Sequence, residues 1–260
     1  MQFTKTIGHE KQKMLLDQIV KNGRLAHAYV FAGPENVGKT TFALELAGIL
    51  GADSIMDLAV FDSEEGLKIE TAREIQNRLS LTPVGILKVA VITHAENMTV
   101  EAANCLLKTL EEPPGRSLLI LVTSNFHALL PTVRSRVQRI NFGLLADSEI
   151  SADVEIRGFA GGRIGLAKRL LADEKLLEFY RQAAKIYKIL YAGSDFDRLK
   201  TAEALAQMEE PQIQAFLKYA GSRFVREPQG RALGEKILGT FRDLQYNLNV
   251  KLTMDNLFLT

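Results

Sequence analysis

The feature that most constrains the fold is a glycine-rich run at residues 31–41, F-A-G-P-E-N-V-G-K-T-T. It contains the pattern G-x-x-x-x-G-K-[ST], whose two glycines let the backbone bend closely around an anion. The loop's N–H groups and the start of the following helix then face a phosphate chain. Lys39 would reach the β- and γ-phosphates, and the Thr40 hydroxyl would bind Mg²⁺ once nucleotide is present. The run therefore predicts a P-loop for ATP or ADP. Its predicted nucleotide-binding residues are Gly33, Pro34, Glu35, Asn36, Val37, Gly38, Lys39, Thr40 and Thr41.

The segments on either side of this run favour the same interpretation. Residues 25–31, L-A-H-A-Y-V-F, have the character of a strand that enters the loop, and residues 41–50 that of a helix that leaves it. Strand, loop and helix in this order are the context in which the pattern forms a P-loop. The alternative is a glycine-rich turn that carries an exposed lysine.

Strand and helix patterns alternate over the first half of the chain. Further strands are predicted at residues 58–61, 89–92, 118–122 and 137–142, and helices at residues 7–22, 69–79 and 100–111. This alternation predicts an α/β domain with a parallel five-stranded sheet that helices cover on both faces. Ligands of such sheets bind at the carboxyl ends of the strands, where the P-loop would lie.

After residue 142 the strand signal fades and helical patterns follow. A glycine-rich turn leads into a helix within residues 157–171, and Asp195 and Pro211 mark joints between later helices. Those later helices are predicted at residues 176–190, 198–208 and 231–248. We expect a nucleotide-binding domain at residues 1–142, a short helical lid at 143–174 and an all-helical domain at 175–260.

Charge is balanced along the chain, whose net charge is +1. Residues 1–142 hold 15 basic and 15 acidic side chains, and residues 143–260 hold 17 and 16. Neither part is basic enough to bind nucleic acid strongly through bulk charge. Contact with DNA is therefore expected through partners or a local patch.

Cys105 is the single cysteine, which excludes internal disulfides and a cysteine-built zinc cage. It lies in an apolar helical pattern and most simply belongs to the core. No run approaches the roughly 18 apolar residues of a membrane span, and the N-terminus M-Q-F-T-K-T-I-G-H-E lacks a signal core. We expect an intracellular protein without a zinc site.

Five further segments carry a family likeness: I-G-H-E-K-Q at residues 7–12, R-L-A-H-A-Y-V-F-A-G at 24–33, A-N-C-L-L-K-T-L-E-E-P-P at 103–114, L-L-P-T-V-R-S-R-V-Q at 129–138 and N-V-K-L-T-M-D-N-L-F-L at 249–259. Together with the P-loop they resemble the AAA+ clamp-loader family, and within it the delta-prime subunits of bacterial DNA polymerase III. The resemblance is strong over residues 1–142 and thin between 150 and 245.

The resemblance implies an AAA+ core, a lid and a helical collar through which subunits assemble. It implies gamma/tau-like ATPase subunits and a delta subunit as partners, with the sliding clamp and primer-template DNA reached through the assembly. It also implies a cytoplasmic place at the replisome. Many relatives carry a four-cysteine zinc module after the P-loop helix, whereas residues 51–65 are short and contain no cysteine.

The second nucleotide motif departs from the family. An active P-loop ATPase ends the corresponding strand with a carboxylate that holds Mg²⁺ through water, usually followed by a second one. Here V-A-V-I-T-H places Thr93 and His94 there, a degenerate Walker B motif. A hydroxyl binds Mg²⁺ far more weakly than a carboxylate. In the lid, active family members place an arginine where this chain has Gly165, and Arg163 lies two positions away.

Other polar residues remain open to two interpretations. Thr123 and Asn125 follow the fourth strand, where they either sense the γ-phosphate or cap the strand. The adjacent carboxylates Glu111 and Glu112 point in different directions on a helix, which favours a structural or subunit-facing role over catalysis. His27 and His127 have no ligand-like spacing to another histidine or cysteine.

Arg136 is the candidate for catalysis in trans. It follows Ser135 in the segment that resembles the family's Ser-Arg-Cys motif, with Val137 in place of the cysteine. A loop before the fifth strand lies near the sheet's edge, away from the chain's own P-loop, so its guanidinium suits a neighbouring subunit's phosphate. Arg134 and Arg139 compete for this role. The alternative for Arg136 is a surface salt bridge.

The sequence thus predicts a delta-prime-like clamp-loader subunit that does not hydrolyse ATP itself but lends an arginine finger to a neighbour. It would be part of an ATP-driven clamp loader and of a DNA-directed DNA polymerase holoenzyme. An autonomous P-loop ATPase, such as a helicase loader, is the alternative that the degenerate motif disfavours. A direct DNA-binding module is disfavoured by the balanced charge.

Overall fold

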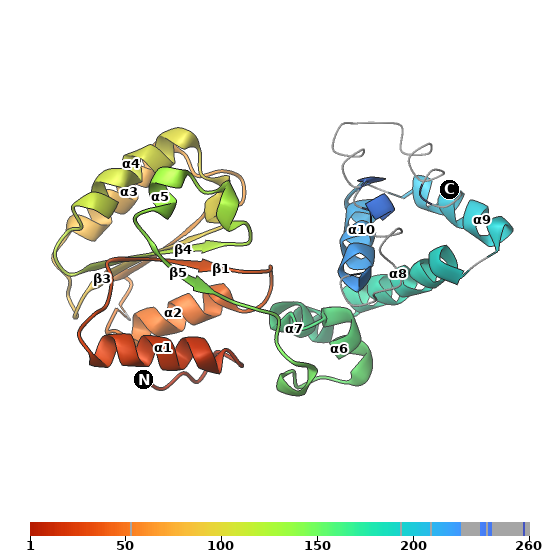
Figure 1. Ribbon diagram of the computed structural model, residues 1–260, viewed down its shortest axis with the longest axis horizontal. Coiled ribbons are helices and arrows are strands. Elements are labelled where there is room, and N and C mark those ends of the chain that lie inside the picture. The colour runs from red at the N-terminus through yellow and green to blue at the C-terminus, as the bar shows by residue number, and fades with distance from the viewer. Residues whose placement is uncertain are drawn as a thin grey trace. The chain divides into compact units, whose positions relative to one another are not determined.

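The computed structural model describes residues 1–52, 54–192, 194–208, 210–224, 235–237, 239–240 and 257. The chain divides into two compact units (Figure 1). The first holds residues 1–151 and 162–167, and the second holds residues 152–161 and 168–260. None of the helices in the described part of the chain combines the length and hydropathy that a membrane span needs.

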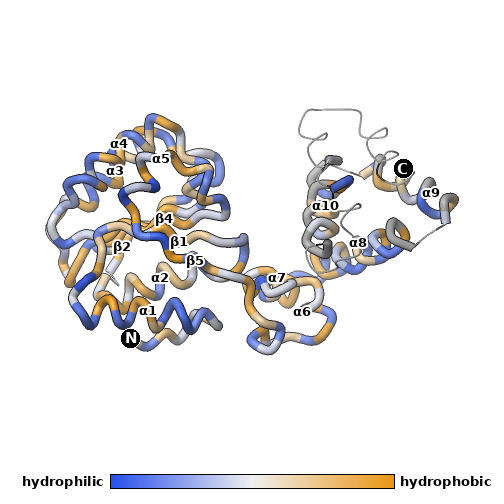
Figure 2. Tube along the Cα trace, in the orientation of Figure 1, coloured by the Kyte–Doolittle hydropathy of each residue, from blue (hydrophilic) through white to orange (hydrophobic). Residues whose placement is uncertain are grey.

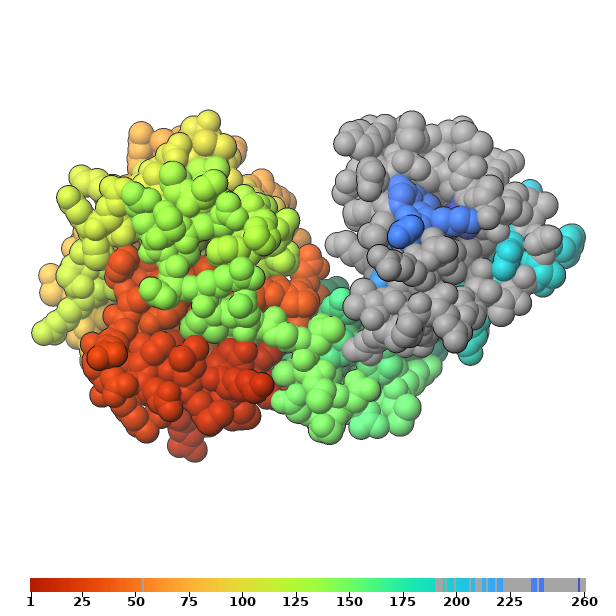
Figure 3. Space-filling view, viewed as in Figure 1, coloured from red at the N-terminus to blue at the C-terminus, as the bar shows by residue number. Residues whose placement is uncertain are grey.

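The first unit is built on a five-stranded sheet with the order β2-β3-β4-β1-β5, and every neighbouring pair is parallel. This confirms the predicted parallel sheet. Its strands are β1 (Ala28–Ala32), β2 (Leu58–Asp62), β3 (Lys88–Thr93), β4 (Ser117–Thr123) and β5 (Gln138–Asn141). On the face of this unit seen in Figure 3, the N-terminal segment in red borders the segment around β5 in green.

Helices cover both faces of this sheet, as the alternating pattern predicted. They are α1 (Glu10–Lys21), α2 (Lys39–Ile49), α3 (Ile69–Ser80), α4 (Val100–Glu111) and α5 (Pro131–Arg134). Strand β1 shows why two cores form: Tyr29 and Phe31 join the core with α2, whereas Ala28 and Val30 join the core with α3 and α4. Successive strand residues point to opposite faces, and Figure 2 shows the hydrophobic stretches that result.

An aromatic cluster fixes the junction of β1, α2 and β5. The Phe42 ring centroid lies 5.7 Å from that of Phe31 and 5.1 Å from that of Phe142, both at steep interplanar angles. Such edge-to-face pairs stabilise beyond the burial of their area. Because Phe142 directly follows β5, the cluster also holds the chain against the P-loop.

The second unit is helical in its described residues. Its helices are α6 (Val154–Ala160), α8 (Glu174–Ala192), α9 (Asp195–Ala206) and α10 (Glu210–Phe224), while α7 (Ile164–Ala172) belongs in part to each unit. Arg181 on α8 donates to both carboxylate oxygens of Glu155 on α6, at 3.1 and 2.8 Å. The hydrophobic core of this unit includes Tyr187, Phe216 and Tyr219.

The sequence places joints at Asp195 and Pro211, and the structure begins α9 at Asp195 and α10 at Glu210, next to Pro211. Helix α10 itself is not among the helices that the sequence patterns predict. Proline is tolerated at a first turn because the N–H that it lacks has no intrahelical partner there. The predicted helix at 231–248 and the segment at 249–259 lie outside the described residues, apart from residues 235–237, 239–240 and 257.

Candidate phosphate-binding edge and arginine site

The P-loop connects the end of β1 to the start of α2, at the carboxyl edge of the sheet. Three of its residues have positive φ: Gly33 at 156°, Asn36 at 60° and Gly38 at 102°. A Cβ atom at Gly33 would lie 2.1 Å from the carbonyl oxygen of Phe142. The first glycine is therefore required by a close backbone approach as well as by its φ angle.

Lys39 is the buried cation of this loop, with 6% of its surface exposed. Its ammonium donates to the carbonyl oxygens of Gly33 at 2.7 Å and Pro34 at 2.6 Å. Burial lowers the pKa of Lys39 to about 8, and the charges of Glu96 and Glu35 act in the opposite direction. Phosphate oxygens could replace the two carbonyl contacts and would satisfy the charge better, because they are anionic.

The rest of the predicted loop suits a phosphate chain. Gly38 caps the N-terminus of α2, where backbone N–H groups and the helix dipole favour an anion. Thr40 is half-buried, Val37 is buried, and Pro34, Glu35, Asn36 and Thr41 are exposed. The loop residues therefore fit the triphosphate that the pattern predicts.

Two segments outside the loop bind its backbone carbonyl oxygens, and the sequence patterns predict neither contact. The His9 ring places Nε2 2.8 Å from the Val37 carbonyl oxygen and packs edge-on against Phe142 at 4.9 Å. The Gly165 N–H donates to the Asn36 carbonyl oxygen at 2.7 Å. The I-G-H-E segment and the start of α7 thus both support the P-loop.

Gly165 stands where active family members are expected to carry an arginine. A Cβ atom at this position would lie 3.0 Å from the Asn36 oxygen and 3.2 Å from the Asn36 Cα atom. A larger residue would push the start of α7 away from the loop. Arg163, the nearby arginine, is half-buried two positions before it.

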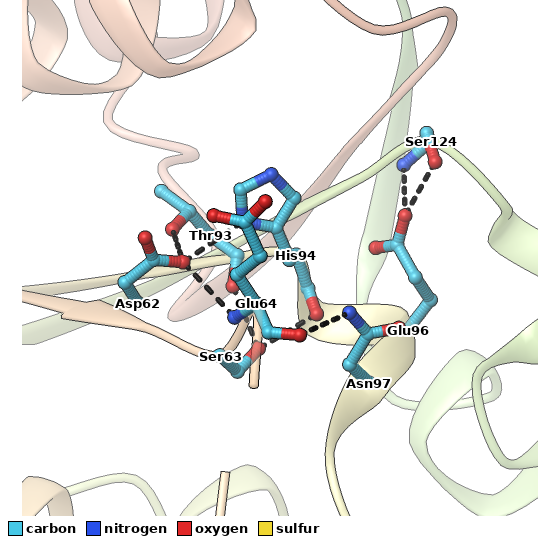
Figure 4. Close-up of polar contacts among 8 residues, drawn as sticks. All are labelled: Asp62, Ser63, Glu64, Thr93, His94, Glu96, Asn97 and Ser124. Atoms are coloured by element: carbon cyan, nitrogen blue, oxygen red, sulfur yellow. Dashed lines mark hydrogen bonds and ion pairs between the residues drawn. The ribbon is translucent and has the colours of Figure 1, made fainter. Parts of the chain in front are cut away.

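Thr93 and His94 are both tied to the end of β2 (Figure 4). The Thr93 hydroxyl and His94 Nδ1 each lie 2.8 Å from Oδ1 of Asp62. These contacts, that of His94 first, lower the pKa of Asp62 below its ordinary value. Asp62, Glu64 and His94 bring ligand-type atoms within 4.8 Å of one another. The Thr93 hydroxyl, which stands in place of the expected carboxylate, thus already donates a hydrogen bond to Asp62.

Glu96 is a further carboxylate at this edge, which sequence reasoning overlooked. It lies in a short 3-10 helix after β3 (Ala95–Asn97) and accepts from the backbone N–H of Ser124 at 2.8 Å and from the Ser124 hydroxyl. Burial alone would raise the pKa of Glu96, but the Ser124 contacts, and the Thr123 hydroxyl in the same direction, hold it below its ordinary value. The side chain is therefore an anion near Lys39.

Thr123 and Asn125, the candidate sensors, lie at the end of β4. Thr123 is buried, and its carbonyl oxygen accepts the N–H of Gly33 at 3.2 Å. Its hydroxyl accepts the backbone N–H of Asn125 at 3.0 Å, whereas the Asn125 side chain is exposed. The structure therefore joins this strand end to the P-loop and gives Thr123 a capping contact as well.

Arg136 lies at the opposite, amino-terminal edge of the sheet, between α5 and β5. Gln138, two residues on, pairs with Tyr29 near the start of β1. Because β1 has five residues, the two edges lie about 16 Å apart. Arg136 is therefore remote from its own P-loop, as its place in the sequence predicted.

The Arg136 guanidinium is held by Glu111 at the end of α4. Its Nη2 atom lies 2.7 Å from a Glu111 carboxylate oxygen, and its Nη1 donates to the Thr132 carbonyl oxygen and to Ser135 Oγ, both at 3.1 Å. The Arg136 side chain is 36% exposed and that of Glu111 51%. This is the surface salt bridge of the alternative interpretation, and it also fixes where the guanidinium points. Glu112 caps the same helix and is exposed.

The competing arginines have a different environment. The guanidinium carbons of Arg134 and Arg139 lie 5.7 and 4.1 Å from the centroid of the Phe126 ring. Arg139 also donates to Asn141 at 2.6 Å, and Arg134 lies 3.1 Å from His127 Nδ1. Both of these guanidinium groups stack on Phe126, whereas that of Arg136 is paired with the Glu111 carboxylate.

The remaining candidates make contacts within the fold. His27 Nε2 lies 3.0 Å from the Leu110 carbonyl oxygen. Cys105 is half-buried on α4, and its thiol lies 3.2 Å from the Gln76 amide oxygen on α3.

The chain is similar in sequence to subunits of DNA polymerase III. A family profile described as "DNA polymerase III, delta subunit" matches residues 50–145. The DNA polymerase III subunit tau of Bacillus subtilis (strain 168) is 27% identical over 203 residues, which cover 70% of this chain and 35% of that protein. The subunit delta' of the same organism is 30% identical over 210 residues, covering 69% of this chain and 64% of that protein. The chain spans about a third of the length of the tau and gamma/tau relatives that it matches.

Solved structures bear on the fold alone. A DNA polymerase III, gamma subunit-related protein of Thermotoga maritima has a TM-score of 0.50 at 23% identity, over 95% of this chain and 97% of that one. The Thermotoga maritima RuvB Holliday junction branch migration motor has a TM-score of 0.51 at 20% identity, over 82% of this chain and 75% of that one. Both confirm the predicted AAA+ arrangement.

Proposed function

Because this chain belongs to the clamp-loader family of AAA+ proteins, we propose that it is a delta-prime-like subunit of the DNA polymerase III clamp loader. In this proposal it does not hydrolyse ATP by itself. It joins gamma/tau-like ATPase subunits and a delta subunit and lends Arg136 to the nucleotide of a neighbour. The sliding clamp and primer-template DNA are reached through the assembly, in the cytoplasm at the replisome.

The observation that carries the proposal is the separation of its two charged sites. The P-loop lies at one edge of the sheet, while the half-exposed Arg136 lies at the other, oriented by its 2.7 Å contact with Glu111. An arginine that cannot reach its own nucleotide but has a fixed direction suits action on a second subunit. An isolated surface ion pair would contribute only about 0–1 kcal/mol to stability.

The parts of the chain have separate roles in this proposal. Residues 1–142 would bind ATP or ADP, residues 143–174 would form the lid, and residues 175–260 would form the collar that holds the ring together. Mg²⁺ would supply charge neutralisation at the phosphates, with the Thr40 hydroxyl among its ligands. Thr123 and Asn125 would respond to the γ-phosphate. The degenerate pair Thr93 and His94 would take no part in catalysis.

The first prediction is that the isolated chain turns ATP over far more slowly than about 1 s⁻¹, the lower end of the ordinary enzyme range. The reason is that neither residue of the degenerate motif can do the work of the carboxylate it replaces. The Thr93 hydroxyl is already given to Asp62, and His94, which also contacts Asp62, stands where a second carboxylate would activate the attacking water. A steady-state phosphate-release assay on the purified chain measures this.

Lys39→Ala is the control in that assay, because it removes the P-loop cation and defines the contaminating background. The variant should lose nucleotide affinity and leave the low rate unchanged. A wild-type rate of about 1 s⁻¹ or more that disappears in Lys39→Ala would establish an autonomous ATPase, such as a helicase loader, in place of the proposed subunit.

A further inference from the structure

We propose that Glu96 supplies the metal-side carboxylate of the P-loop, in place of the one that is missing at Thr93. Its free oxygen would accept hydrogen bonds from the water shell of a Mg²⁺ ion bound with nucleotide. This inference rests on the proposed nucleotide binding. It assigns to Glu96 a role that neither the motif pattern nor the clamp-loader resemblance gives it.

One Glu96 oxygen is fixed and the other is buried without a partner. Oε1 accepts from the N–H and the hydroxyl of Ser124 at the end of β4. Oε2 is buried and makes no hydrogen bond among the described residues, although the nearby Thr123 hydroxyl helps to lower the pKa of the carboxyl group. Figure 4 shows the side chain held at this single point, with its second oxygen directed away from Ser124. Buried carboxylate oxygens are ordinarily satisfied, so an unpaired one indicates a ligand or ordered water.

The charge around this oxygen favours a hydrated cation. Glu96 is ionised, since its pKa lies below the ordinary value, and its charge acts on the ammonium of Lys39 in the P-loop. A phosphate placed directly against this anion would be repelled. A divalent ion with its water shell between them would be attracted to both, and Mg²⁺ prefers oxygen ligands and keeps several waters.

The backbone after β3 explains how Glu96, three residues beyond the usual carboxylate position at Thr93, could face a metal ion at the P-loop. His94 adopts a left-handed conformation with φ of 49°, and the chain then turns through the short helix Ala95–Asn97. This turn brings Glu96 across to Ser124 at the end of β4, the strand that lies between β3 and β1. The carboxylate is thereby moved along the edge toward the strand that carries the P-loop.

The other carboxylates nearby are less suited to the role. Oδ1 of Asp62 already accepts from the Thr93 hydroxyl, from His94 and, at 3.1 Å, from the backbone N–H of Glu64. Glu64 is exposed on the segment that follows β2, the edge strand farthest from β1 in this direction. Among the carboxylates described at this edge, Glu96 combines an ionised state with a buried oxygen that has no hydrogen-bond partner.

The test is the Mg²⁺ dependence of nucleotide binding by the full chain. Calorimetry measures the ADP affinity of the wild type, Glu96→Gln and the control Glu64→Gln, each with Mg²⁺ and with EDTA. Glutamine keeps an acceptor for Ser124, and thermal melts check that each variant is folded.

Outer-sphere carboxylates change metal affinity by about 10- to 100-fold. The ratio of the ADP affinity with Mg²⁺ to that with EDTA should therefore fall by about tenfold in Glu96→Gln, and the affinity in EDTA should not fall. Bound Mn²⁺, followed by electron paramagnetic resonance in the presence of ADP, should weaken in the same variant.

Other outcomes are distinguishable. If Glu96→Gln keeps the full Mg²⁺ gain, or if it binds ADP more tightly with and without metal, Glu96 only neutralises Lys39 and the inference is wrong. An equal loss in Glu64→Gln would overturn it too, because the effect would then be general surface charge. If the wild type binds no ADP under either condition, the proposed nucleotide binding itself fails, and the inference fails with it.

Discussion

If Arg136 acts in trans as proposed, replacing it with alanine should lower ATP hydrolysis by the reconstituted clamp loader by a large factor at the neighbouring site that it faces. An arginine supplied in trans to a phosphoryl-transfer transition state raises the rate by about 10³ to 10⁵. At 1.36 kcal/mol for each tenfold change, this corresponds to roughly 4 to 7 kcal/mol of transition-state stabilisation. The measurement is hydrolysis stimulated by DNA and clamp, with a parallel assay of clamp loading. If the other ATP sites in the ring continue to hydrolyse ATP, a single-turnover assay isolates the rate at the site that Arg136 faces.

Two further variants separate this mechanism from a merely structural role. Arg136→Lys should rescue only in part, because an ammonium lacks the forked geometry that grips two phosphate oxygens. Arg139→Ala is the matched control, since it removes a nearby arginine that stacks on Phe126 rather than pairing with Glu111. Each variant must assemble at wild-type yield. Unchanged hydrolysis and loading in an assembled Arg136→Ala complex would defeat the trans-arginine mechanism.

Gly33→Ala should be among the most destabilising single changes in the chain, by about 4 kcal/mol or more. Its new methyl group would lie 2.1 Å from the Phe142 carbonyl oxygen and 2.9 Å from the carbonyl carbon, where backbone cannot yield as a flexible side chain can. Phe142 is itself fixed, because its N–H donates to Ala32 at 2.7 Å and its ring packs on Phe31 and Phe42. Denaturant unfolding of the full chain measures the loss.

Gly23→Ala is the control for that experiment. Gly23 also has positive φ, at 65°, but a Cβ atom there would meet nothing within 4 Å. Its substitution should cost about 1–2 kcal/mol, the strain of a left-handed alanine alone. If the two variants lost equal stability, the close contact between the P-loop and Phe142 would play no part in holding β1 to β5.

Local signals predicted much of the first unit. The strand that ends at the P-loop, the helix that follows it and the helix at residues 100–111 have short periodic patterns, and the structure has them within a few residues. The parallel sheet follows because strands joined by helices must run the same way. Arg136 could be placed at the edge opposite to the P-loop because it precedes a strand while the P-loop follows one.

Contacts between residues distant in sequence could not be predicted in this way. The pairing of Arg136 with Glu111, of Thr93 with Asp62 and of Glu96 with Ser124 each joins two elements whose register only the folded sheet determines. The sequence did carry weak signals. Asp62 directly follows the strand predicted at residues 58–61. Glu96 lies two residues after Thr93 and His94, the positions where a carboxylate pair is expected. Neither signal indicates which oxygen remains unpaired.

Helix boundaries in the second unit show a different limit. Pro211 correctly marks the break between α9 and α10, because proline is compatible with the first turn of a helix. The sequence patterns nevertheless do not predict α10, the helix that begins there.

The proposal that this chain works as one subunit of a clamp loader is tested by the mass of the complex in which it is isolated. The full chain would be co-expressed with the gamma/tau-like and delta subunits of its own organism, purified through a tag on this chain, and measured by native mass spectrometry. We expect one assembly of defined mass that contains all of these subunits and survives gel filtration. Recovery of the tagged chain free of these partners, at concentrations where the partners assemble with one another, would contradict it.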